Sequence, residues 1–139
     1  MFDFFKPSSK VSYPDWGVFV LRVSVSLLLL THGYGKLLSF LNGASDFPDP
    51  LHVGSQISHA LAVIGEVVAP LLIMAGLWTR LTAVVEIIHF LVVVFLMHAN
   101  DPLSEREHGL LYLIAYITIL LLGGGKYSLD ESRYKKRRF

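Results

Sequence analysis

The chain of 139 residues contains no cysteine. It therefore has no disulfide, no thiolate ligand for a metal ion and no thiol relay of its own. A redox reaction on this chain would need a bound cofactor or the thiols of a partner protein.

Charged residues are also scarce, at 17%, whereas hydrophobic residues make up 53% and the mean hydropathy is +0.55. A small soluble domain of this composition could not cover its surface with polar groups. The formal net charge of +1 says little about partners. We expect the main partner to be the lipid bilayer and expect no nucleic acid.

Four apolar runs are long enough, or nearly long enough, to cross a hydrocarbon core that takes about 20 helical residues. The amino end lacks a short apolar core with a cleavage site, so we expect the first run to be retained. The predicted fold class is all-α, an integral membrane four-helix antiparallel bundle. Its runs are Trp16 to Leu38, Ile57 to Trp78, Leu81 to His98 and His108 to Gly124. We divide the chain into an N-terminal segment (1–15), the transmembrane domain (16–125) and a basic tail (126–139).

Lysine and arginine are distributed unevenly along the chain. They gather near both ends and at Arg80 in the short second link. The other side has only Arg106 and, at the end of the first run, Lys36, while the first loop holds none. Basic residues favour the cytoplasmic side of a membrane. This pattern predicts that both termini are cytoplasmic and that the two longer loops face outward.

Several ionisable residues lie inside the apolar runs, where an unpaired charge costs at least about 2.5 kcal/mol. Counting 1.5 Å per residue places Arg22 and Glu86 at a similar depth, which predicts an ion pair between them. Glu66 and His89 fall near the centres of their runs and form the second predicted pair. Tyr116 lies at a similar depth and is the expected hydroxyl donor to that pair.

These polar residues have three interpretations. They can bond only to each other and fix helix packing, or they can line a pocket that handles protons or a quinone. A metal site is the weakest interpretation, because the sequence does not reproduce the ligand spacing of known helical metal sites. Pro70 favours the pocket, since it frees the carbonyl of Glu66 and should kink the helix beside that acid. His32 lies near the outer rim with several other histidines.

The order of short motifs resembles that of the DoxX family of small four-helix bacterial membrane proteins. The resemblance covers about residues 16 to 130, where the closing motif has Gly124 in place of the family's usual proline. The residues that carry it are Arg22, the segment HGYGKL with Gly35 and Lys36, the pair Gly65 and Glu66, the turn GLWTRLTA with Gly76, Thr79 and Arg80, and the closing GGGKYSLD.

The resemblance implies a bacterial inner membrane and, for some relatives, a membrane subunit that passes electrons from a sulfur donor to a quinone. We therefore expect a quinone-linked or redox-associated subunit, with quinone as the candidate cofactor. The expected catalytic residues are Glu66, as the proton-exchanging acid, and His89, as a donor to a ligand oxygen. The expected cofactor-binding residues are Arg22, Glu86, Tyr116 and His32, and no metal ligands are expected.

Two other classes of function remain open. One is a non-catalytic scaffold whose loops or basic tail recruit another membrane or redox protein, with homo-oligomers among the expected assemblies. The other is a small transporter, for which four helices leave little room unless the protein dimerises.

Overall fold

The computed structural model describes residues 14–136. Most of the predicted N-terminal segment and the last three residues of the basic tail lie outside this range. All regular secondary structure in the described part is helical, and this part contains no strand. Its elements are α1 (Pro14–Leu41), α2 (Ser55–Val63), η2 (Ile64–Val68), α3 (Ala69–Ala75), α4 (Thr79–Val92), η3 (Val93–Met97), α5 (Leu103–Leu122) and α6 (Leu129–Lys136).

Three helices in the described range are long and apolar enough to cross a membrane. They are Asp15–Leu41, Ser55–Ala75, which joins α2, η2 and α3, and Thr79–Met97, which joins α4 and η3. The predicted fourth span corresponds to α5, which has 20 residues but carries Glu105, Arg106 and Glu107 near its start. On length and composition the first three predicted spans are confirmed, each within about three residues at either end.

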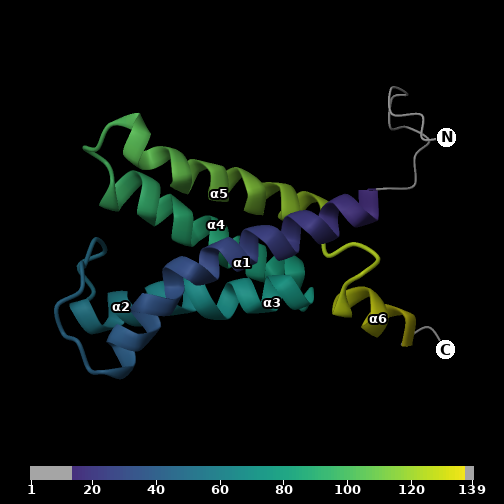
Figure 1. Cartoon of the computed structure of the whole chain (residues 1–139), viewed down its shortest axis with the longest axis horizontal. Helices are drawn as coiled ribbons and strands as arrows, with labels where there is room; N and C mark the ends of the chain where they lie inside the picture. The colour runs from purple at the N-terminus through teal and green to yellow at the C-terminus, as the bar shows by residue number, and fades with distance from the viewer. Residues whose placement is uncertain (1–13, 137–139) are drawn as a thin grey trace.

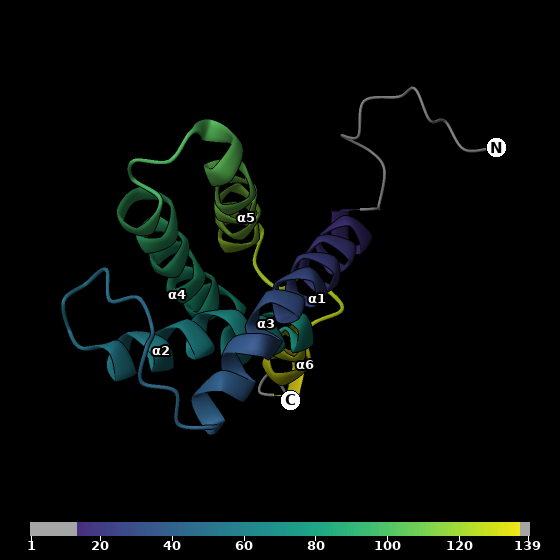
Figure 2. The ribbon, with the colours of Figure 1, turned by 60° about the vertical axis from the view of Figure 1, so that its left-hand side comes forward.

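The long helices run back and forth, so that the start of α1 and the helix α6 lie at the same end of the bundle (Figure 1). We call this the α6 end. The loops 42–54 and 98–102 lie at the opposite end, which we call the loop end (Figure 1). Helix α1 packs on α2, η2 and α3 and also meets α5, while α4 pairs with α5. Figure 2 shows α1 crossing in front of α3, with the α4 and α5 pair to one side.

Glycines in the left-handed conformation end two of the helices. Gly43 (φ 74°) follows α1, and Gly76 (φ 71°) follows α3. At Gly76 the N–H bonds to the Ile73 carbonyl at 3.0 Å, and the next N–H bonds to Leu72 at 2.9 Å. This is the Schellman arrangement, which satisfies the last carbonyls of a helix. At the start of α5, Pro102 precedes the helix and no side chain caps it.

A wide π turn, η2, interrupts the second long helix between Ile64 and Val68. Pro70 follows directly, and its ring removes the hydrogen bond that would reach back four residues to Glu66. The carbonyl of Glu66 lies against Gly33 of α1, where an added Cβ would stand only 2.3 Å from the oxygen. The helix is thus irregular beside the buried acid, as a π turn that α1 approaches closely, and the kink expected at Pro70 stays a prediction.

Candidate functional site

Glu66 is the centre of a polar cluster inside the bundle. Its side chain is 6% exposed, and Oε1 forms an ion pair with Nζ of Lys36 in α1. Nε2 of His89 in α4 donates to the same oxygen at 3.3 Å. The other oxygen, Oε2, is buried and has no partner among the described residues. The predicted contact between Glu66 and His89 is confirmed, and one carboxylate oxygen remains available to a ligand.

The cluster is held by contacts to the backbones of neighbouring helices. Gly65 lies against the ring of His89, where an added Cβ would stand 2.6 Å from that ring. Nε2 of His59 donates to the backbone carbonyl of Lys36 at 2.9 Å. The ring of His59 stacks on Phe47 of the first loop, with centroids 4.2 Å apart. His59 is therefore a positioning residue that fixes the end of α1 beside Glu66.

An apolar cavity of about 160 Å³ opens on one side of Glu66, between the second long helix and α4. Its ionisable groups, Lys36, Glu66 and His89, lie together, and the remaining wall is mostly aliphatic. Phe47, Pro50 and Leu51 of the first loop complete the lining. An engineered cavity of about 150 Å³ binds benzene, so this cavity holds roughly one six-membered ring.

A second cavity, of about 200 Å³, opens on the other side of Glu66. We call it the polar cavity, because ionisable side chains from three helices and one loop line it. They are His32, Lys36, Glu66, His98, Glu105, Arg106, His108 and Tyr112. Lys36 and Glu66 therefore belong to both cavities.

Glu86 lies in a separate buried group at the α4 interface with α1 and α5. Its side chain is fully buried, and neither carboxyl oxygen has a hydrogen-bond partner in the part of the chain that the structure describes. The hydroxyl of Tyr116 interacts electrostatically with Glu86 and lies near the hydroxyl of Ser26. The expectation that Tyr116 donates to Glu66 or His89 is therefore wrong, because its hydroxyl faces Glu86.

Arg22 does not pair with Glu86, so the predicted ion pair between them is wrong. Its Nη1 donates to the carbonyls of Ile73 and Met74 at 2.9 and 3.1 Å, and Nη2 donates to the carbonyl of Tyr127 at 2.8 Å. Matching depth could not reveal this partner choice, because the free carbonyls at a helix end compete for a guanidinium. Arg22 thus ties the end of α3 to the segment that leads into α6.

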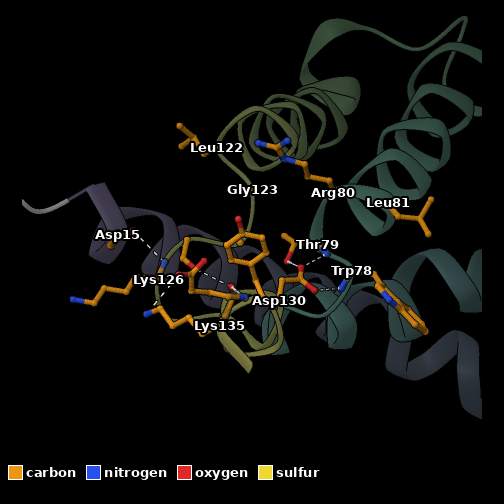
Figure 3. Close-up of a pocket in the computed structure, with 15 residues that line it drawn as sticks. Asp15, Trp78, Thr79, Arg80, Leu81, Leu122, Gly123, Lys126, Asp130 and Lys135 are labelled. Carbon is orange, nitrogen blue, oxygen red and sulfur yellow. Dashed lines mark hydrogen bonds and ion pairs between the residues drawn. The ribbon is translucent and has the colours of Figure 1, made fainter. Parts of the chain in front are cut away.

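Asp130 of α6 caps the start of α4 (Figure 3). Its carboxylate accepts the backbone N–H groups of Trp78 and Thr79, both at 2.8 Å, and the Thr79 hydroxyl at 2.8 Å. Partial burial opposes ionisation of Asp130. The hydrogen bonds from Thr79 and Trp78 outweigh it, so the pKa of Asp130 lies below its usual value. The tail was not expected to form a helix, and α6 is in fact fixed to the bundle.

A wide groove of about 810 Å³ lies between α6, the start of α4 and the glycines that end α5 (Figure 3). Its charged residues include Asp15, Arg80, Lys126 and Glu131. Asp15 accepts the backbone N–H of Lys126 at 3.1 Å. The acids of this groove are used in capping and pairing, so the groove is chiefly a structural joint between α6 and the bundle.

The structure brings together Glu66, His89 and His32, of which His32 lines the polar cavity. Arg22, Glu86 and Tyr116 lie elsewhere in the interior. The sequence analysis missed Lys36 as a site residue, because its place at the end of the first apolar run was interpreted as a topology signal. Its long side chain, which is 37% exposed, reaches back from the rim to Glu66. Among residues 14–136, no cluster of three or more histidines and acids could hold a metal ion.

Apolar helices of spanning length around buried, paired ionisable residues define a polytopic helical membrane protein. The sequence profile of the DoxX family matches residues 17–99, and the chain belongs to this family.

Two relatives match over nearly their whole length. The inner membrane protein YqjF of Escherichia coli K12 is 27% identical over 128 residues, which cover 88% of this chain and 95% of the relative. An uncharacterized protein of Haemophilus influenzae Rd is 25% identical over 135 residues, which cover 89% of this chain and 96% of the relative. No solved structure matches the chain.

Proposed function

We propose that the chain is an inner-membrane subunit that binds the ring of a quinone in the apolar cavity and exchanges protons at Glu66. The observation that carries the proposal is the place of Glu66, which lines a ring-sized apolar cavity and has a buried Oε2 without a partner in the described chain. A quinone site needs an apolar slot together with hydrogen-bonding groups near the ring oxygens. The residues present fit that requirement.

A quinone takes up two electrons and two protons when it is reduced to the hydroquinone. The chain has no cysteine and no metal cluster in its described part, so the electrons would come from a partner subunit that oxidises a reduced sulfur compound. In this proposal Glu66 holds and exchanges a proton, and His89 turns its Nε2 hydrogen bond from Glu66 to a ring oxygen when the quinone binds. Lys36 keeps the carboxylate of Glu66 in position through Oε1.

The membrane topology belongs to the same proposal. We place α5 across the membrane as a fourth span, because it packs against α4 and its 15 residues after Glu107 extend about 22 Å. The α6 end, with Arg80, Lys126, Arg133, Lys135 and Lys136, would be cytoplasmic. The loop end would then face outward.

The test is extraction of the protein purified in mild detergent, followed by mass spectrometry of the bound small molecules. We expect quinone at up to one molecule per chain in the wild type and at least a tenfold loss in Glu66→Gln, because a hydrogen-bonding site rejects a poor partner by about that factor or more. Equal quinone in both proteins would contradict the role of Glu66. If the wild-type protein retains no quinone, the result would favour the non-catalytic scaffold.

The scaffold remains the second candidate, favoured by the way α6 is held. Arg22 and Asp130, both engaged with backbone groups, fix α6 to the bundle and present its basic residues. A photo-reactive cross-linker placed at Arg133, which is exposed, would then yield one defined adduct in native membranes. The absence of any adduct would count against recruitment through α6.

A further inference from the structure

The two cavities beside Glu66 differ in chemistry although they share a wall. Lys36, Glu66 and Val93 line both of them. The apolar cavity is bounded mainly by aliphatic residues such as Ile64, Val85 and Ile88. The polar cavity is bounded by histidines and charged residues of α1, η2, the turn after η3 and α5, and its apolar wall consists of Leu29, Phe90, Val93 and Val94. Glu66 therefore stands between an environment like lipid and an environment like water.

Several contacts tie the polar cavity to the loop end. Nδ1 of His98 lies 2.6 Å from the carboxylate of Asp101 in the loop 98–102, and both side chains are more than one third exposed. Arg106 lies over the ring of Phe95 and has a buried Nε with no partner in the described chain. Glu105 and His108 are exposed at the same rim. Polar groups thus continue from the surface of the loop end into the bundle.

Deeper in the polar cavity, Tyr112 connects the rim to Glu66. Its ring stacks on Phe90 with centroids 5.0 Å apart and meets the ring of His32 edge-on at 6.3 Å. Tyr112 also interacts electrostatically with Glu66. A polar cavity of about 200 Å³ has room for several water molecules, each of about 30 Å³, and its side chains offer the partners that buried water needs.

We infer that the polar cavity is a water-filled vestibule that joins Glu66 to the loop end and to no other surface of the bundle. Protons held by Glu66 then exchange with the solvent on the loop side, while an apolar ligand approaches from the opposite wall. The use of this path for a quinone and the side of the membrane that it reaches rest on the proposed function, whereas the water-filled connection between Glu66 and the loop end does not. The vestibule gives the site a defined side of the membrane for proton release or uptake.

The cysteine-free sequence makes the vestibule directly testable with single cysteines in the full-length protein in sealed proteoliposomes. The probe is a charged, membrane-impermeant methanethiosulfonate, which reacts only where the thiol ionises in water. Tyr112→Cys and His32→Cys report on the vestibule. Leu111→Cys is the matched control, because it is adjacent to Tyr112 and 59% exposed on the outside of α5. Ala99→Cys and Arg133→Cys mark the loop end and the α6 end.

We expect Tyr112→Cys and His32→Cys to react within about tenfold of the rate at Ala99→Cys, and from the same side of the membrane. Leu111→Cys should react at least about a hundredfold more slowly, because lipid excludes both water and the probe. If both vestibule positions react as slowly as Leu111→Cys in correctly folded protein, or react from the Arg133 side, the inference is overturned.

Tyr112→Cys and His32→Cys probe the same vestibule, so a local folding defect in one of them does not decide the result. Each variant is accepted only if its thermal unfolding matches that of the wild type. Quinone binding is measured separately on the cysteine-free protein. Slow labelling together with normal binding overturns the vestibule and leaves the proposed function intact. Fast labelling in a protein that binds no quinone sustains the vestibule and contradicts the proposed function.

Discussion

The two buried glutamates differ in their surroundings. Glu66 has a cation and a histidine at Oε1, whereas the fully buried Glu86 has no hydrogen bond at either oxygen within the described chain. A polar group contributes to stability through the partners that it would lose on substitution. The same substitution at these two positions should therefore have unequal effects.

We predict that Glu66→Gln lowers the free energy of unfolding by about 1–3 kcal/mol. The substitution breaks the ion pair with Lys36 and leaves a buried amide that is a poorer hydrogen-bond partner for the neighbouring side chains. Glu86→Gln should change the free energy of unfolding by less than about 1 kcal/mol, because neither oxygen of Glu86 has a hydrogen-bond partner in the described chain. Thermal unfolding of the two variants in one detergent makes the comparison. A larger loss at Glu86 would contradict the assigned contacts.

At this scale the sequence predicted the buried polar residues and one of their contacts. Glu66 and His89 could be paired because both lie near the middle of adjacent runs. Lys36 was missed as a site residue and Arg22 was given the wrong partner for the same physical reason. A long side chain reaches groups far from the depth of its own backbone. Arg22 moreover binds backbone carbonyls, and no pattern of side chains indicates which carbonyls a helix end leaves free.

At the scale of helices, the fit of α1 against η2 depends on Gly33. An added Cβ at Gly33 would stand 2.3 Å from the Glu66 carbonyl oxygen, whereas one at Gly35 would meet nothing within 4 Å. We predict that Gly33→Ala destabilises the protein by about 1–3 kcal/mol through overpacking. Gly35→Ala should be neutral or stabilising by up to about 1 kcal/mol, because alanine is the better helix former.

Chemical or thermal unfolding of the matched pair Gly33→Ala and Gly35→Ala checks this prediction. The measured stability alone separates the two outcomes. Equal effects at the two glycines would show that α1 does not approach η2 as described.

The cap that α6 places on α4 predicts a pH dependence. The pKa of Asp130 in the folded protein is below its usual value of 3.8, so its contribution to stability is complete above that pH. The contribution is lost as the pH falls through the lowered pKa. We predict that Asp130→Asn loses about 1–2 kcal/mol at pH 7, the typical value of a helix cap.

Unfolding of the wild type and of Asp130→Asn between pH 7 and about pH 3 provides the measurement. The difference between the two proteins should narrow as the pH falls below 3.8, because the unfolded wild-type chain then binds a proton at Asp130 more readily than the folded protein does. A difference that stays constant down to that pH would mean that the carboxylate charge has no role in the cap.

The elements themselves were largely predictable, since apolar runs and breakers determine where long helices begin and end. Pro70 predicted a kink next to Glu66, and no sequence pattern indicated the π turn that lies there. Helix α6 was missed because its residues are polar and charged, and it is held by tertiary contacts of Asp130 and Arg22 that no local pattern reveals.

For the whole molecule, the order of the helices predicts a sidedness. The loops 42–54 and 98–102 lie at one end of the bundle and α6 lies at the other. If α5 crosses the membrane, single cysteines at Ala44 and Ala99 should be labelled from one side, and a cysteine at Ser132 from the other. Labelling of Ser132 from the same side as Ala99 would contradict the fourth span.

The central claim is that Glu66 and the apolar cavity form one quinone site, and a binding titration tests it most directly. A water-soluble quinone analogue is titrated into the wild type, Val85→Phe and Val84→Phe. Val85 lines the apolar cavity, whereas its neighbour Val84 does not, and the two are equally exposed, at 38% and 39%. We predict saturable binding to the wild type and to Val84→Phe, and at least a tenfold weaker affinity, about 1.4 kcal/mol, in Val85→Phe. Equal binding by all three proteins, or no saturable binding by the wild type, would contradict the account.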